Sequence, residues 1–326
     1  MKTTEFTFLS QDGKTPIHAV RWEPDDGKWI AVLQITHGMV EYIQRYAAFA
    51  EYLTQHGFLV VGHDHLGHGK SVSDTVELGY FSDQNPSDVV VADIHQLRQK
   101  TQKENPGLPY FMLGHSMGSF MLRKYLARYG KGLSGAIIMG TGYIAPNTNR
   151  MGLSVVRLLT VLMGAHHRSP LVQKLINGPS YRGFDTTGKD PVKSWLSRDT
   201  EMVRKYYADP YCTFTFTLNG FRGLFEAAQF ACKPENANRI PKALPLLLVS
   251  GGNDPVGDHG TGVELVYQMY QEAGIQDLDC ILYEGARHEV LNEVNRAQVY
   301  EDLYRWLYAH VEAEAGRRHF PPVVEE

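Results

Sequence analysis

The chain has 326 residues and a formal net charge of −4, which is enough length for one large α/β domain with an insertion. Its pI near 6.4 and the lack of any Lys/Arg cluster argue against a nucleic-acid partner and against a basic membrane-binding patch. No segment is apolar over the length that spans a bilayer, and the first residues lack the apolar core of a signal peptide. Cys212, Cys232 and Cys280 have no metal or redox spacing, which favours a reducing compartment. We therefore expect a cytoplasmic protein.

Two buried strands are predicted in the N-terminal third, at residues 29–35 and 58–62, because both are continuous apolar runs. Three histidines, His63, His65 and His68, follow the second run. A metal site is not favoured there, because glycines break any helix and ligands one residue apart diverge. We therefore expect neither a metal nor a cofactor.

The next strand carries the most informative motif of the chain. Residues 114–118 read GHSMG, and they lie between the apolar run 110–113 and a helix-like segment at residues 119–129. A strand, G-x-S-x-G and a helix in this order form the nucleophile elbow of α/β-hydrolases. The same five residues without these flanks would be a common glycine-rich turn.

The elbow motif predicts the backbone conformation of its serine and the position of one oxyanion donor. The turn is so tight that its serine has a strained backbone, which Gly114 and Gly118 allow because they lack a β-carbon. Ser116 is then an exposed nucleophile. The main-chain N–H of Met117, at the start of the helix, faces the oxyanion that forms on the substrate.

The interval 145–235 separates the predicted strands 136–139 and 245–250 without the strand–helix alternation of its flanks. It is rich in aromatic residues and in Gly, Pro and Asn loops. An insertion at this point of an α/β-hydrolase is a cap that closes over the serine and excludes water. We predict a hydrolase core, residues 1–144 and 236–326, and a mainly helical cap, residues 145–235.

One helix of the cap, at residues 151–163, has an unusual pattern. Its polar residues Ser154, Arg157 and Thr160 form one narrow stripe, and nearly all the others are Leu, Val or Met. A helix packed on one side needs a narrower apolar surface. The pattern fits contact with an acyl chain or, transiently, with a membrane surface, and it equally fits a helix packed between cap and core.

The acid of a catalytic triad is predicted after the strand 245–250, where Asp254 follows in the sequence GGNDP. Functional groups of parallel sheets lie at the carboxyl ends of strands. Asp258 lies four residues further from the strand end and ranks second. The strand 136–139 ends in Gly-Thr-Gly without an acid, which removes the other common position.

The base is predicted after one further helix and strand. A helix at residues 263–273 and a strand at 280–283 separate Asp254 from His288, and they suffice for a single crossover. His288 directly follows that strand, whereas His259 and His310 have no strand end behind them. The order Ser, Asp, His is that of the α/β-hydrolases.

The oxyanion hole needs a second main-chain N–H, which α/β-hydrolases take from the loop after an early strand. That loop reads THGMVEY at residues 36–42. Met39 is the candidate donor, because Gly38 before it lets the main chain come close to the substrate.

Four motifs together resemble the monoacylglycerol lipase and lysophospholipase group of α/β-hydrolases. They are HGxxE at residues 37–41, DxxGHGxS at 64–71, GHSMG at 114–118 and HExxNE at 288–293. The resemblance implies Ser116 as nucleophile, Asp254 as acid, His288 as base, and Met39 and Met117 as oxyanion donors. Val40 and Tyr42 stand where the group usually has Gly and His, and this departure concerns the substrate more than the reaction.

The expected function is that of a serine ester hydrolase that cleaves a small-molecule lipid monoester, such as a monoacylglycerol or a lysophospholipid, through an acyl-enzyme. Epoxide hydrolases and dehalogenases of this fold use a carboxylate nucleophile, which Ser116 argues against. A peptidase or an acyltransferase would use the same triad. A non-catalytic binding protein is the alternative from another class, although such a protein has no use for a base.

Overall fold

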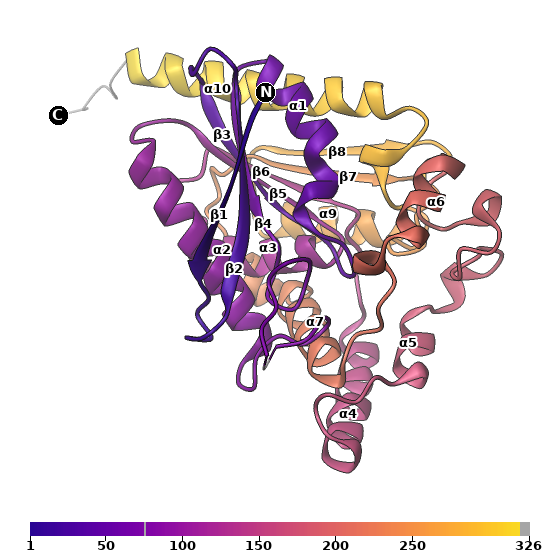
Figure 1. Ribbon diagram of the computed structural model, residues 1–326. Coiled ribbons are helices and arrows are strands. Elements are labelled where there is room, and N and C mark those ends of the chain that lie inside the picture. The colour runs from indigo at the N-terminus through magenta and orange to yellow at the C-terminus, as the bar shows by residue number, and fades with distance from the viewer. Residues whose placement is uncertain (75, 320–326) are drawn as a thin grey trace.

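The computed structural model describes residues 1–74 and 76–319 and is built around one eight-stranded sheet (Figure 1). The strands are β1 (Lys2–Leu9), β2 (Pro16–Glu23), β3 (Ala31–Thr36), β4 (Phe58–His63), β5 (Tyr110–His115), β6 (Gly135–Met139), β7 (Leu246–Gly251) and β8 (Leu278–Tyr283). Their order in the sheet is β1-β2-β4-β3-β5-β6-β7-β8. β2 pairs antiparallel with β1 and with β4, and all other pairs are parallel. The predicted mostly parallel α/β-hydrolase sheet is confirmed.

Helices cover both faces of the sheet. The longer ones are α1 (Ala47–Gln55), α2 (Pro86–Glu104), α3 (Met117–Tyr129), α4 (Pro146–Met163), α5 (Pro170–Ile176), α6 (Thr200–Ala208), α7 (Leu218–Ala231), α9 (Thr261–Glu272) and α10 (Arg296–His319). The short ones are α8 (Pro234–Ala237) and the 3-10 turns η1 (Ile43–Tyr46), η2 (Pro179–Tyr181), η3 (Pro191–Lys193), η4 (Pro210–Cys212) and η5 (Val290–Asn292).

The alternation of side chains along the strands separates two cores. Along β5, Phe111 and Leu113 belong to the core beneath α1 and α10. Tyr110 and Met112 belong to the core beneath α2, α3 and α9. Because both faces are covered, the central strands are apolar throughout, which is why they read as continuous runs in the sequence.

The C-terminal end of the chain differs from one sequence expectation. The sequence predicts a short loose tail from Gly316. In the structure α10 continues to His319, so this expectation is wrong for the first part of the tail. α10 begins at Arg296, and adding residues to an existing helix costs less free energy than nucleating a new one. Residues 320–326 of the predicted tail lie outside the described residues.

The segment predicted as a cap contains α4 to α7. Figure 1 shows α4, α5 and α6 on one side of the molecule, outside the layers that flank the sheet. α7 is different, since it packs against α2, α3 and α4. Its residues Phe221 and Ala228 are fully buried in the core beneath α2 and α3. Part of the predicted cap is therefore also part of the packing of the sheet.

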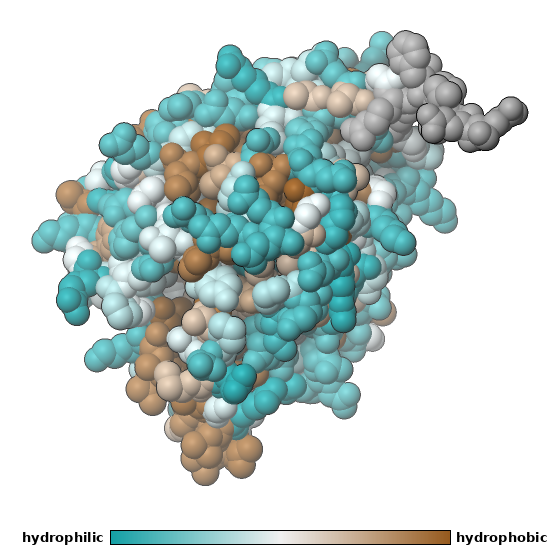
Figure 2. All heavy atoms as spheres, turned by 180° about the vertical axis from the view of Figure 1, so that it is seen from behind, coloured by the Kyte–Doolittle hydropathy of each residue, from teal (hydrophilic) through white to brown (hydrophobic). Residues whose placement is uncertain are grey.

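Exposed apolar side chains gather on α4 and α5. Figure 2 shows them at the lower tip of the molecule, where Figure 1 places α4. We call this surface the apolar tip, and its residues are Leu158, Val161, Leu162, Met163, Leu171 and Leu175. On the opposite side of α4, Leu153 and Val156 are buried. Among the described residues, no helix has the length and hydropathy that crossing a bilayer requires.

Candidate active site

Ser116 lies in a sharp turn between the end of β5 and the start of α3. Its backbone angles are φ 54° and ψ −121°, a conformation that costs a non-glycine residue of order 1–3 kcal/mol. A β-carbon at Gly118 would lie 2.1 Å from the carbonyl oxygen of Thr36, and one at Gly114 would lie 2.5 Å from that of Gly118. The two glycines therefore let α3 begin directly against the end of β3, as the elbow motif predicts.

The structure brings the three predicted triad residues together. Nε2 of His288 lies 2.8 Å from Oγ of Ser116. Nδ1 of the same ring lies 2.9 Å and 3.0 Å from the two carboxylate oxygens of Asp254. Nδ1 must therefore donate to the carboxylate, which leaves Nε2 as the atom that accepts the serine proton. This arrangement is that of a nucleophile, a base and an orienting acid.

Asp254 is fully buried and has two further hydrogen-bond donors. Ser250 Oγ donates to one carboxylate oxygen (3.1 Å), and the N–H of Val256 donates to the other (2.9 Å). Burial alone would raise the pKa of Asp254, but His288 and these donors hold that pKa below its ordinary value. The rival acid, Asp258, instead accepts a hydrogen bond from the hydroxyl of Ser180.

The two predicted oxyanion donors flank Ser116. Met117 follows it at the start of α3, and Met39 lies in the loop after β3. Neither main-chain N–H has a main-chain acceptor among the described residues. A β-carbon on Gly38 would lie 3.0 Å from Cβ of Ser116, so this loop passes directly beside the nucleophile. The N–H of Gly38 is already used, because it donates to the side chain of Glu41.

Comparison with known proteins agrees with this geometry. The model of the family described as "Serine aminopeptidase, S33" matches residues 27–295. The chain belongs to this family.

Two relatives and one crystal structure indicate which hydrolases this chain is similar to. A monoacylglycerol lipase from Mycolicibacterium smegmatis is 30% identical over 94% of this chain and 98% of its own length. Monoglyceride lipase from Rattus norvegicus is 27% identical over 92% of this chain and 89% of its own. The crystal structure of a carboxyl esterase from Bacillus coagulans, in complex with glycerol, matches with a TM-score of 0.86 at 30% identity, over 95% of this chain and 99% of that one. The resemblance to monoacylglycerol lipases is confirmed, and the protein is a carboxylester hydrolase.

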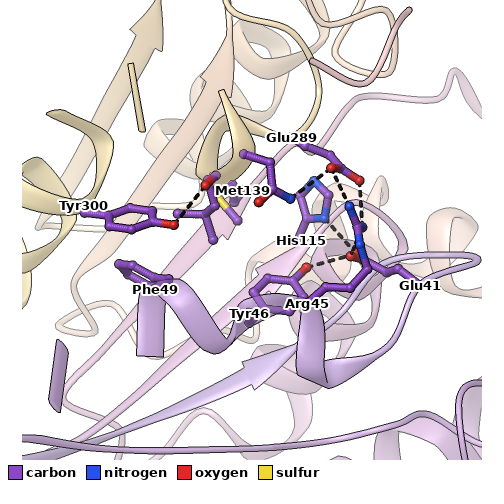
Figure 3. Close-up of a pocket in the computed structure, with 10 residues that line it drawn as sticks. Glu41, Arg45, Tyr46, Phe49, His115, Met139, Glu289 and Tyr300 are labelled. Atoms are coloured by element: carbon purple, nitrogen blue, oxygen red, sulfur yellow. Dashed lines mark hydrogen bonds and ion pairs between the residues drawn. The ribbon is translucent and has the colours of Figure 1, made fainter. Parts of the chain in front are cut away.

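Figure 3 shows a buried cluster in which the charged side chains of Glu41, Arg45 and Glu289 lie around His115. Glu41 accepts hydrogen bonds from Arg45 (2.8 Å), from the hydroxyl of Tyr46 (2.9 Å) and from His115 (2.9 Å). Arg45 also binds Glu289 through two bonds of 2.8 Å and 2.7 Å. The cavity between these residues has a volume of about 10 Å³. It has room for one water molecule at most and cannot hold a substrate.

The histidines at the end of β4 and in the loop after it are buried and neutral. Burial lowers the pKa of both His63 and His68 to about 3. The N–H of His65 donates to Nε2 of His37 (2.8 Å), and Nδ1 of His37 donates to the carbonyl of Gly38 (2.8 Å). Through these bonds, His37 and His65 hold the loop that carries Met39 in place. Within residues 1–74 and 76–319, no group of side chains could hold a metal ion.

The sequence did not indicate how the predicted cap contacts the base. The indole of Trp195 lies against the imidazole of His288 with the ring planes inclined by 30°, and the main-chain N–H of His288 donates to the carbonyl of Trp195 (3.3 Å). The N–H of Glu289 donates to the carbonyl of Leu196 (2.7 Å). The guanidinium of Arg287 donates to the carbonyls of Val192, Ser194 and Ser197.

Proposed function

We propose that this hydrolase cleaves a lipid monoester, of the monoacylglycerol or lysophospholipid type, through an acyl-enzyme on Ser116. The observation that carries the proposal is the unbroken chain of hydrogen bonds from Ser116 through His288 to Asp254. A serine is a weak nucleophile unless a neighbouring base takes its proton, and this base is held in the tautomer that can do so.

In the proposed mechanism, Oγ of Ser116 attacks the ester carbonyl while Nε2 of His288 takes the serine proton. The main-chain N–H groups of Met39 and Met117 donate to the oxyanion of the tetrahedral intermediate. His288 then gives the proton to the leaving alcohol, and the acyl group remains on Ser116. Water, activated by the same base, attacks the acyl-enzyme and releases the fatty acid. Asp254 stays ionised throughout and stabilises the imidazolium that forms at each step.

Two observations support a lipid as the substrate. The relatives named as monoacylglycerol or monoglyceride lipases are aligned over most of this chain and most of their own length. The apolar tip also exposes large side chains, with Val161 84% exposed and Leu162 70% exposed. A contiguous apolar surface of this kind is typical of a site that contacts a membrane or another protein. We propose that residues 145–235 act as a cap and that its apolar tip contacts the lipid surface transiently.

The description of the matching family makes peptide hydrolysis the second candidate. An aminopeptidase needs a carboxylate to bind the free amino group of its substrate. The two carboxylates behind the triad, Glu41 and Glu289, are both paired with Arg45. Neither is available for a substrate amine, which favours ester hydrolysis.

Labelling and turnover test the proposal together. A fluorophosphonate should label the wild-type enzyme on Ser116, as identified by mass spectrometry of the labelled peptide. Turnover should be measured on monoacylglycerols and lysophospholipids of increasing chain length, with aminoacyl p-nitroanilides alongside. We expect hydrolysis of monoesters and none of the anilides. Labelling of another serine, or faster cleavage of the anilides, would contradict the proposal.

A further inference from the structure

His115, the residue before the nucleophile, has an acceptor at each of its two ring nitrogens. Nδ1 lies 2.9 Å from Oε1 of Glu41, and Nε2 lies 3.3 Å from the main-chain carbonyl oxygen of His288. The ring is buried, and its centroid lies 4.7 Å from that of the His288 imidazole, with the ring planes inclined by 40°. One side chain therefore contacts both the loop that carries the oxyanion donor and the loop that carries the base.

Both contacts require a proton on the ring nitrogen. A main-chain carbonyl can only accept, so Nε2 must donate to it. Glu41 accepts from Arg45, from the hydroxyl of Tyr46 and from the N–H of Gly38, so its carboxylate is ionised and Nδ1 must donate as well. Burial alone would raise the pKa of Glu41, but His115 and Arg45 hold it far below its ordinary value.

The charges of the cluster balance only if His115 carries a proton on both nitrogens. Glu41 and Glu289 contribute two negative charges, and Arg45 contributes one positive charge. A neutral His115 would leave one net negative charge in a buried site, which is costly. The titratable or charged groups that face His115 from the packed elements are His37, Glu41, Arg45, Tyr46, His288 and Glu289.

We propose that His115 is a positioning residue that remains an imidazolium throughout the catalytic cycle, joining the oxyanion loop to the loop of the catalytic base. The role in turnover rests on the proposed function of Ser116 and His288. His115 does not touch the substrate. Its Nδ1–H donates to Glu41, and Glu41 accepts the N–H of Gly38, the residue before Met39. Its Nε2–H donates to the carbonyl of His288.

The proposal has a defined pH dependence. Burial alone would lower the pKa of His115, but the Glu41 carboxylate outweighs burial and raises that pKa above its ordinary value. A group with a raised pKa makes its contribution below that pKa and loses it as the pH rises through it. On deprotonation the ring keeps only one of its two donated bonds, so one of the two loops is released. Turnover should therefore decline on the alkaline side.

The protonation state can be observed without any substrate. In a uniformly ¹⁵N-labelled enzyme, ring ¹H–¹⁵N correlations report each histidine nitrogen, and the signals of His115 are those absent from His115→Gln. We expect both nitrogens of His115 to be protonated at pH 6, with a titration midpoint above about 6.5, the ordinary value for histidine. An unprotonated ring nitrogen at pH 6, or a midpoint below the ordinary value, would overturn the proposal.

Kinetics test the positioning role. With a short soluble ester, the kcat of the wild type should decline at the pH where His115 titrates. In His115→Gln, kcat should be lower by about 10- to 100-fold with little change in KM, because the reacting groups are displaced rather than lost. Its alkaline decline should disappear. A variant that keeps the wild-type decline would show that another group causes it.

The matched control is His18, which also lies between two carboxylates but outside the site. Its ring nitrogens lie 2.9 Å from Asp64 and 2.9 Å from Glu5. We expect His18→Gln to keep both kcat and the alkaline decline. If His115→Gln does not fold, Glu41→Gln replaces it, because loss of the negative charge should move the midpoint of His115 and the decline to lower pH. An unchanged midpoint in Glu41→Gln would overturn the proposal.

The two proposals can fail separately. An enzyme that hydrolyses no ester would contradict the proposed function, while the NMR titration would still decide the protonation of His115. An active monoester hydrolase with a neutral His115 would overturn this inference alone.

Discussion

The indole of Trp195 lies against the imidazole of His288, with ring centroids 4.9 Å apart and ring planes inclined by 30°. Trp195 comes from the segment between η3 and α6, whereas His288 follows β8. The imidazole of His115 also lies close to this ring, with centroids 4.7 Å apart. The base is therefore covered by an aromatic face from a distant part of the chain.

Trp195 should assist turnover through this contact. His288 becomes a cation during the proposed reaction, and a cation on an aromatic face gains about 0.5–2 kcal/mol. Trp195→Ala should therefore lower kcat by roughly 2- to 30-fold. Trp195→Phe keeps an aromatic face and should lose less. Equal kcat values for the wild type and both variants, measured on a short soluble ester, would show that the indole only fills space.

Ser116→Ala should fold normally and lose hydrolysis by on the order of 10⁴-fold or more, because the triad acts as a unit. Covalent labelling by a fluorophosphonate should be lost with it. Ser154→Ala, at an exposed position of α4, is the control and should behave like the wild type. A labelled Ser116→Ala enzyme would mean that another serine carries the chemistry.

Asp254→Asn should keep the fold and the KM but lower kcat by about 10⁴-fold, since an amide stabilises the wrong tautomer of His288. Asp258→Asn is a matched change four residues away and removes only the acceptor of a hydrogen bond from Ser180. It should have a far smaller effect. The assignment of the acid would be reversed if Asp258→Asn were the more damaging of the two.

The apolar tip should increase the affinity of the enzyme for a lipid surface. Replacing both Val161 and Leu162 by Asp removes apolar area that a bilayer interface would bury, and binding to zwitterionic vesicles should fall by at least about tenfold. Activity on long-chain monoacylglycerol in those vesicles should fall with it, while activity on a short soluble ester should not change. Leu265→Asp, an exposed position on α9, is the control. A vesicle affinity equal to that of the wild type would contradict the proposed contact.

The triad could be predicted from the sequence because each member follows a strand: Ser116 and Asp254 follow the buried strands β5 and β7, and His288 follows the more exposed strand β8. A continuous apolar run is a local signal, and parallel strands end at one edge of the sheet, so Ser116, Asp254 and His288 could be expected to meet there. The sequence of the proposed cap predicted its structure less well than the sequence of the sheet did. The pattern of α4 indicated more apolar surface than one packed side requires, but it did not tell which residues are buried. In the structure Leu153 and Val156 are buried, whereas Leu158 and Leu162 face solvent.

The contact between Trp195 and His288 had no sequence signal at all. Trp195 lies in an irregular segment without helical or strand periodicity, and its position is fixed by hydrogen bonds to a loop far along the chain. The sequence indicated the residues of the charged cluster but not that they contact one another. Glu41, His115 and Glu289 belong to the motifs of the family resemblance, but their joint contact with Arg45 depends on the tertiary fold.

The hydrogen bonds of Arg287 join residues 192–198 to the loop of His288 as one mechanical unit. Ser197 adds a bond to the carbonyl of Asn292 (2.8 Å), and Arg198 adds an ion pair with Glu293 (2.9 Å). We therefore expect a substrate that enters by displacing part of the insertion to leave this segment in place. Replacing α4 and α5 by the corresponding helices of a related enzyme should therefore change the substrate preference and leave the position of His288 unchanged.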